Sequence, residues 1–223
     1  MPSATGEQMN AINRDSRAYW NKRAATFIRF ATGEYERWLT DLLALNPGEE
    51  LLDMGCATGT LAIPLARAGH RVHGCDFADA MLAILDERAA AEHLPITSHL
   101  LAWEDDWEAA GLGTDSVDVA FASRSLMAEA VGPFVAKLDS AGRSRAAVAV
   151  PASLPPSSDP RLLTYLGRAA KHPRNARKVL RALRAMGRIP TCATTTTFRP
   201  MRFSSFDEAY SDLPRPARPD PVP

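Results

Sequence analysis

Cysteine is scarce in this chain of 223 residues: only Cys56, Cys75 and Cys192 occur, and no two of them form a Cys-x-x-Cys pair. An odd number of cysteines without such a pair argues against a disulfide framework and against a zinc site. His70 and His73 lie close to Cys75 in the sequence, but strand alternation turns these two imidazoles to opposite faces. We therefore expect reduced thiols and no bound metal.

Long apolar runs and an excess of charge are also lacking. No stretch approaches the length of a membrane span, and residues 1–20 lack the apolar core of a signal peptide. Lys plus Arg number 26 and Asp plus Glu number 26, so the formal net charge is zero. We expect a cytoplasmic protein with no membrane partner and no general affinity for nucleic acid. Its length and its 46% hydrophobic content suit one α/β domain with a buried core.

The most informative pattern lies in residues 49–79. A short apolar run ends at Asp53, and a turn punctuated by Gly55 and Gly59 follows it. The apolar positions that come next favour a helix, and an extended segment then leads to Asp76. The sequence therefore predicts a strand, a glycine turn, a helix and a second strand that ends in an acid.

This geometry favours a nucleoside-bearing ligand. Glycines let a ligand approach the backbone, and free N–H groups at a helix start attract negative charge. An acid at the end of the second strand is placed to accept both hydroxyls of a ribose. A dinucleotide fingerprint would need glycines at the first, third and sixth positions, which are Gly55, Ala57 and Thr60 here. The pyrophosphate-binding pattern therefore fails.

What remains is acid-x-Gly-x-x-x-Gly with a second acid one strand later, which resembles the cofactor motif of the class I S-adenosylmethionine-dependent methyltransferases. The resemblance implies a doubly wound, mostly parallel Rossmann-like sheet and S-adenosylmethionine as the cofactor. In that family the first acid orients the methionine amino group, the glycine turn lines the sulfonium and carboxylate, and the second acid holds the ribose. Here these roles fall on Asp53, on residues 55–59 and on Asp76. Ala57 departs from the family's usual middle glycine, and a tight turn in some other α/β protein is the alternative.

The resemblance also implies contacts to the adenine. Phe77 is placed to stack beside the base, and the family usually sets a carboxylate near the end of the third strand, where Glu104 and Asp105 are equal candidates. The alternative for these two acids is a helix N-terminal run stabilised by the macrodipole. The residues that we expect to contact the cofactor are Asp53, Gly55, Cys56, Ala57, Thr58, Gly59, Asp76, Phe77, Met81, Trp103, Glu104, Asp105 and Ser123.

Beyond the motif, strands and helices continue to alternate. The patterns predict helices over 8–30, 34–45, 80–91, 131–139, 174–187 and 205–210, and strands over 97–102, 117–122, 146–150 and 194–198. The family's sheet commonly ends in an antiparallel edge strand, and we find no candidate for it. Either the sheet stops at six strands or a second copy fills the edge in a homodimer.

We divide the chain into four parts on these patterns. They are an N-terminal helical lid (1–48), the cofactor-binding core (49–150), helices and a strand that complete the domain (151–213) and a disordered proline-rich tail (214–223). The Tyr-Trp-x-x-Arg string that begins with Tyr19 and Trp20 resembles a lid over the cofactor and substrate. Burial of these aromatic side chains in the core is the alternative.

Two basic features bear on the methyl acceptor. Arg124 follows the fourth strand, where it either pairs with Glu104 or Asp105 or meets an acid group of the substrate. Residues 161–206 contain no Asp or Glu, and the helix over 174–187 has a basic face. That face is a solvated surface, a site for a phosphate-bearing substrate or RNA, or a site for an acidic protein.

The function that we expect is methyl transfer from S-adenosylmethionine to a small metabolite. The more specific expectation is that this metabolite is anionic. The sulfonium is intrinsically reactive, so a general base is optional and we assign no catalytic residue. One alternative is an RNA methyltransferase that uses the basic segment over 161–202. The other is a methyltransferase-like protein that binds without turnover, which Ala57 and the missing edge strand favour.

Overall fold

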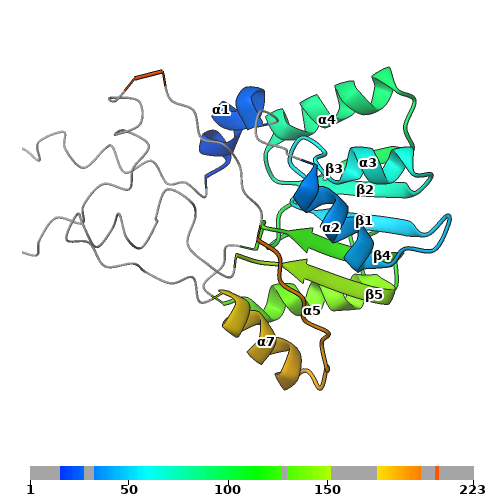
Figure 1. Cartoon of the computed structure of the whole chain (residues 1–223), viewed down its shortest axis with the longest axis vertical. Helices are drawn as coiled ribbons and strands as arrows, with labels where there is room; N and C mark the ends of the chain where they lie inside the picture. The colour runs from blue at the N-terminus through cyan, green and yellow to red at the C-terminus, as the bar shows by residue number, and fades with distance from the viewer. Residues whose placement is uncertain (1–15, 28–32, 127–129, 152–174, 197–203, 206–223) are drawn as a thin grey trace, which may run out of the picture.

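The structure, a computed structural model, describes residues 16–27, 33–126, 130–151, 175–196 and 204–205. Its centre is a five-stranded, wholly parallel sheet in the order β3-β2-β1-β4-β5 (Figure 1). The strands are β1 (Glu50–Met54), β2 (Arg71–Asp76), β3 (Ile96–Leu100), β4 (Val117–Ser123) and β5 (Gly142–Ala149). The direction of winding reverses between β1 and β4. Ligands of such sheets bind beyond the carboxyl ends of the strands at this point.

Helices cover both faces of the sheet (Figure 1). They are α1 (Arg17–Phe27), α2 (Glu34–Leu43), α3 (Ala62–Arg67), α4 (Asp79–Ala91), α5 (Gly132–Ala141) and α7 (Asn175–Ala185). One core cluster joins α2, α3 and α4 to the face that carries Leu51, and a second joins α5 to the face that carries Leu52. Both leucines are fully buried, as expected for the central strand of a parallel sheet.

The predicted alternation of strands and helices from 49 to 150 is confirmed, with small shifts at several element ends and one larger error. The fifth strand begins at Gly142 and not at 146, because the polar residues before 146 pair with β4. Main-chain pairing to an established neighbour therefore extends a strand through a sequence of low strand propensity.

The predicted sixth strand over 194–198 is not formed at 194–196, where the three threonines are exposed and irregular. Strand propensity without a neighbouring strand to pair with does not make a strand. Residues 197–198, the loop after 151 and the tail lie outside the described residues, as do most of the predicted helix 205–210 and both ends of the one over 8–30. Within the described ranges no helix is long and apolar enough to cross a bilayer.

Candidate functional site

The turn between β1 and α3 is fixed by its backbone. The N–H groups of Gly55 and Cys56 donate to the Cys75 carbonyl at 2.7 and 2.9 Å, which ties the turn to β2. A Cβ on Gly55 would lie 2.1 Å from the Cβ of Ser125, whose hydroxyl donates to the Met54 carbonyl at 2.6 Å. Gly55 is therefore required both by its φ of +81° and by the close approach of the loop after β4.

Ala57, the departure from the family pattern, has a φ of +49°. A left-handed conformation costs a residue with a Cβ roughly 1–2 kcal/mol. Its N–H donates to the Asp76 carboxylate at 2.9 Å, which offsets part of this cost. The turn thus keeps the shape that a glycine would give it, with one methyl group added.

Asp53, the last acid of β1, is 1% exposed. Neither carboxylate oxygen has a hydrogen-bond partner in the described part of the chain. Burial, and after it the charge of Asp76, raise the pKa of Asp53 to about 8 against the opposing effect of the Ala62 backbone N–H at the start of α3. An unsatisfied buried carboxylate is costly, so this position fits a ligand that brings its own positive charge and N–H donors.

Asp76 ends β2 beside the turn and is also buried. Its two oxygens each accept one backbone N–H at 2.9 Å, from Ala57 and from Ala78. Burial raises the pKa of Asp76, and the N–H groups of Ala78, Ala57 and Phe77 oppose that rise. Each carboxylate oxygen can accept more than one hydrogen bond, so the group retains capacity for ligand hydroxyls.

The other residues expected at the turn differ in what they offer a ligand. Cys56, Thr58 and Gly59 are buried, and the Thr58 hydroxyl has no hydrogen-bond partner among the described residues. Burial raises the pKa of the Cys56 thiol well above its usual range, which makes it unreactive. Phe77 is half-buried, at the start of the loop that leads into α4.

At the end of β3, Asp105 serves a local turn. Its carboxylate accepts the Ala102 N–H at 2.7 Å, and the Lys137 ammonium donates to the Asp105 carbonyl. Glu104 is exposed. The Trp103 ring lies 5.5 Å from Trp107 and 5.6 Å from Phe134, and its indole N–H is buried with no partner in the described residues. Glu104 is thus the freer of the two acids that the sequence left unranked.

α1 lies directly against the glycine turn. Trp20 and Phe27 pack on the cluster of Ala24, Ala78 and Met81, which Ala57 also contacts. Met81 is 1% exposed, so it is a buried member of the cluster against which the turn packs and is not an open ligand contact. The two alternatives for Trp20 were burial in the core and a lid over the cofactor. Its position is compatible with both, since the ring is packed in this cluster and also lies next to the candidate ligand site.

Asn21 is a residue of this region that the sequence analysis missed. Its amide donates to the Asp79 carboxylate at 2.9 Å and accepts the Ala80 N–H at 3.1 Å, so it fastens α1 to the first turn of α4. Tyr19, in contrast, is held by Arg23, whose guanidinium lies 5.6 Å from the Tyr19 ring centroid and hydrogen-bonds to its hydroxyl.

A second missed residue, Tyr35 of α2, reaches the end of β4. Its hydroxyl and the Ser123 hydroxyl are 2.7 Å apart, and the Arg124 guanidinium lies 4.4 Å from the Tyr35 ring centroid. Burial raises the pKa of Tyr35, while the Ser123 hydrogen bond and Arg124 oppose the rise. Arg124 itself is exposed, with a φ of +57°, and no ion pair of the described residues includes it. Of the two alternatives for Arg124, pairing with Glu104 or Asp105 is not seen among the described residues, where the guanidinium lies over the Tyr35 ring instead.

The histidines lie elsewhere. His70 contacts the Glu49 carbonyl, whereas His73 lies 3.0 Å from both a Glu50 oxygen and the His99 Nε2. No group of three or more His, Cys, Asp or Glu side chains suited to a metal is present in the described ranges.

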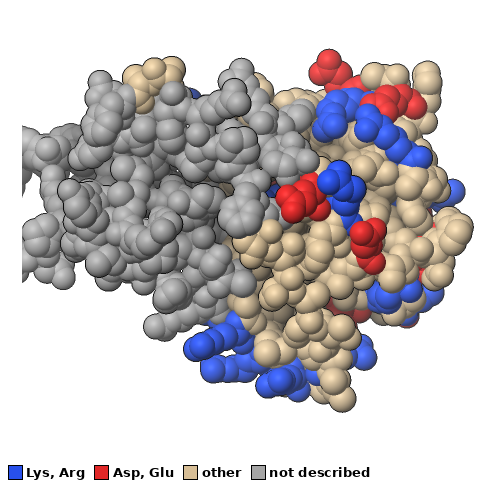
Figure 2. Space-filling model, in the orientation of Figure 1, with Lys and Arg blue, Asp and Glu red and all other residues tan. Residues whose placement is uncertain are grey.

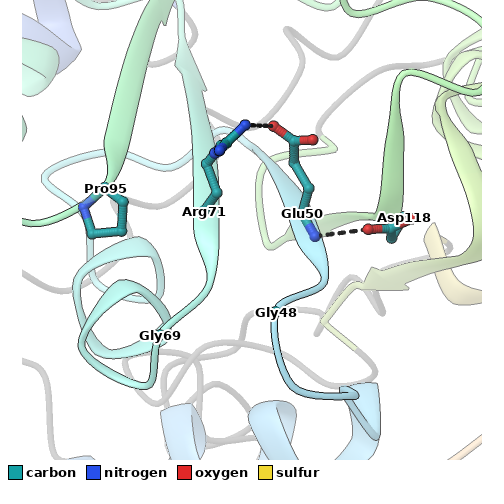
Figure 3. Close-up of a pocket in the computed structure, with 6 residues that line it drawn as sticks. All are labelled: Gly48, Glu50, Gly69, Arg71, Pro95 and Asp118. Atoms are coloured by element: carbon teal, nitrogen blue, oxygen red, sulfur yellow. Dashed lines mark hydrogen bonds and ion pairs between the residues drawn. The ribbon is translucent and has the colours of Figure 1, made fainter.

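A hollow of about 380 Å³ lies at the amino ends of β1 and β2, at the opposite edge of the sheet from the turn (Figure 3). Its charged groups already satisfy one another: the Arg71 guanidinium is 3.5 Å from Glu50, and Asp118 accepts the Glu50 N–H at 2.9 Å. This hollow therefore lacks the unsatisfied groups that mark the glycine turn.

Residues 51–140 match the family described as "Methyltransferase domain". The malonyl-[acyl-carrier protein] O-methyltransferase of Serratia marcescens is 34% identical over 108 residues, 48% of this chain and 38% of that protein. The human glycine N-methyltransferase is 35% identical over 80 residues, 35% of this chain and 27% of that protein. The chain spans about half or less of the length of the curated relatives that it matches.

A solved structure of geranyl diphosphate methyltransferase in complex with SAM aligns with a TM-score of 0.55 at 17% identity, over 75% of this chain and 69% of that one. At this identity the likeness concerns the fold. Together with the parallel sheet and the acid-flanked glycine turn, these findings confirm the predicted fold class. The match to the methyltransferase domain family over residues 51–140 coincides with the part of the chain that forms the Rossmann-like fold.

Proposed function

We propose that the protein binds S-adenosylmethionine at the turn between β1 and α3 and transfers its methyl group to a small acceptor. The observation that carries the proposal is Asp53, a buried carboxylate with two unsatisfied oxygens. The ammonium of the cofactor's methionine part would supply both the charge and the donors that this group lacks. Asp76 would accept the ribose hydroxyls with the capacity left beside its two backbone hydrogen bonds.

The cofactor supplies an electrophilic methyl group on a sulfonium, so the protein has mainly to align the acceptor and exclude water. Trp20 and Tyr19 on α1 would wall the site on the side of Ala57. Tyr35 and Ser123 would line it at the end of β4, where their linked hydroxyls offer a polar contact to the acceptor. A general base is not required by this scheme.

For the acceptor we propose a small anionic metabolite, with a carboxylate or phosphate group that Arg124 binds. The guanidinium is exposed, is held over the Tyr35 ring at 4.4 Å and has no carboxylate partner among the described residues. An arginine fork oriented in this way suits a planar carboxylate or a phosphate. The malonyl group and glycine, which the names of the two relatives specify, both carry a carboxylate.

Isothermal titration and thermal shift with S-adenosylmethionine and S-adenosylhomocysteine test the cofactor. Saturable heat and a raised melting temperature are expected, and their absence at roughly 1 mM ligand would refute the proposal. Asp76→Ala should weaken binding by roughly 1.5 to 3 kcal/mol, the loss of charge-assisted hydrogen bonds. Asp86→Ala, an exposed acid of α4, is the matched control and should leave affinity unchanged.

Production of S-adenosylhomocysteine with pairs of acids and their neutral amides tests the acceptor. Turnover is expected with the acids only, and no turnover with any acceptor would favour a binding protein. With an acceptor in hand, Arg124→Lys should raise KM or lower kcat while cofactor affinity stays the same, because the fork is lost and the charge is kept. Joint loss of stability and cofactor binding would instead assign Arg124 a structural role.

A further inference from the structure

The helix α7 has two different faces. Val179, Ala182 and Leu183 pack against α5 in a cluster that includes Val131 and Val135. This packing fixes how the helix is rotated about its axis. Its opposite face is therefore held toward solvent in one orientation.

That outer face is a ridge of three exposed arginines, Arg177, Arg181 and Arg184. Their spacing of four and three residues places them on one stripe, about 10 Å long at a rise of 1.5 Å per residue. Figure 2 shows Lys and Arg side chains gathered at this end of the molecule, over the position of α7 in Figure 1. We call these three residues the arginine ridge.

The described residues provide no counter-charge for the ridge. Arg188, just beyond the helix, is paired with Asp139 at 2.8 Å, whereas no ion pair within the described residues includes a ridge arginine. Residues 161–206 contain no Asp or Glu that could serve as a partner from the same segment. Like charges at this spacing destabilise a helix by about 0.2–0.5 kcal/mol per pair. The ridge is thus a small cost to the isolated fold.

We propose that the arginine ridge docks an acidic surface of a partner protein, one that presents carboxylates at helical spacing. Each guanidinium offers a planar pair of N–H donors that matches one carboxylate. The stripe would engage Glu or Asp side chains that are four and three residues apart on a facing helix.

Other polyanions match the ridge less well. Helix α7 carries no aromatic side chain on which bases could stack, and the chain as a whole has a net charge of zero, unlike domains that bind nucleic acid through their general field. An anionic membrane would need the apolar face of α7 for insertion, and that face is buried against α5.

The test uses the full chain and a lactam-stapled helical peptide with Glu at positions i, i+4 and i+7. A peptide of the same composition, with its glutamates spread around the helix, is the control ligand. We expect saturable binding of the first peptide at low salt, and at least about tenfold weaker binding by the variant with Arg177→Glu and Arg181→Glu. Arg177 lies in the first turn of α7, where a carboxylate is compatible with the helix dipole.

Matched exposed arginines on α1 and α2 provide the protein control: Arg17→Glu with Arg37→Glu should leave peptide affinity unchanged. Equal binding of the two peptides would overturn the proposal, and so would an equal effect of the two charge reversals. Tighter binding to a single-stranded oligouridine, or to vesicles containing phosphatidylserine, would also overturn it. S-Adenosylhomocysteine binding should be the same in all variants, so this outcome is independent of the proposed methyl transfer.

Discussion

The hydroxyl oxygens of Tyr35 and Ser123 lie 2.7 Å apart although 88 positions separate the two residues in the chain. Through this contact the first turn of α2 meets the carboxyl end of β4, and the same tyrosine ring carries the Arg124 guanidinium. The edge of the sheet next to the glycine turn is thus built jointly by the segment before β1 and the loop after β4.

Tyr35→Phe tests this contact. The variant keeps the ring under Arg124 and loses one partly buried hydrogen bond, so we expect a loss of about 1 kcal/mol in the free energy of unfolding. Urea denaturation measures it. Tyr19→Phe, which removes an exposed tyrosine hydroxyl contact, should cost less than about 0.5 kcal/mol. Equal costs for the two variants would show that the Tyr35 hydroxyl contributes nothing specific.

Asp53→Asn should separate stability from binding. The ordinary pKa of this carboxyl is 3.8 and its folded value is about 8, so between these values the folded state binds more protons than the unfolded state. Stability of the wild type therefore falls as pH rises through this window and levels off above it. The variant lacks this slope and should be more stable at about pH 8 by roughly 1–3 kcal/mol, with little difference at about pH 4.

The same variant should lose cofactor binding, because the amide no longer attracts the ammonium. Asp79→Asn is the control: this exposed acid has a lowered pKa, mainly through its hydrogen bond to Asn21, so its replacement cannot give a gain that grows with pH. Chemical denaturation across pH measures both variants. The raised pKa of Asp53 would be contradicted if the stability of the wild type rose from pH 4 to 8 and that of Asp53→Asn rose by the same amount.

Comparing Gly55→Ala with Gly111→Ala separates the effect of steric overlap with Ser125 from the effect of backbone strain. A Cβ at this position would overlap Ser125, whereas a Cβ on Gly111 would meet nothing within 4 Å, and both glycines have positive φ values, +81° and +74°. Gly111→Ala should cost only the left-handed strain of roughly 1–2 kcal/mol. Gly55→Ala should cost at least about 1 kcal/mol more, as overpacking does, and should weaken cofactor binding. Equal melting temperatures would exclude the overlap.

His99→Gln should reduce the sensitivity of the fold to acid. Burial and the neighbouring His73 lower the pKa of His99, so the folded state binds fewer protons than the unfolded state below the ordinary value of 6.5. Stability is consequently lost as pH falls below that value. The variant should lose less than the wild type between about pH 7.5 and 5.5, whereas His93→Asn at an exposed turn should behave as the wild type does.

The parts of the fold that could be predicted from the residues are those with local determinants. The strand, glycine turn, helix and second strand between Asp53 and Asp76 depend on the alternation of apolar residues and on turn residues within one segment. Both can be recognised from the sequence alone. Tyr35 with Arg124 and Asn21 with Asp79 could not be predicted in this way, because each contact depends on how distant elements pack. The start of β5 was missed for a related reason, since pairing with β4 overrode the polar character of the residues near Gly142.

The wholly parallel sheet has a consequence for how the chain reaches its fold. β1 pairs with β2 soon after both are made, but its other edge stays open until β4 is available, and the Glu50 N–H meets its Asp118 acceptor across 68 positions. During synthesis the strand that carries the apolar residues Leu51 and Leu52 therefore has one unpaired edge until β4 is made. Chains in this state are prone to associate with one another. A chain truncated before β4 should scatter light as aggregates, and a soluble monomer of that fragment would show that β1 is protected by other means.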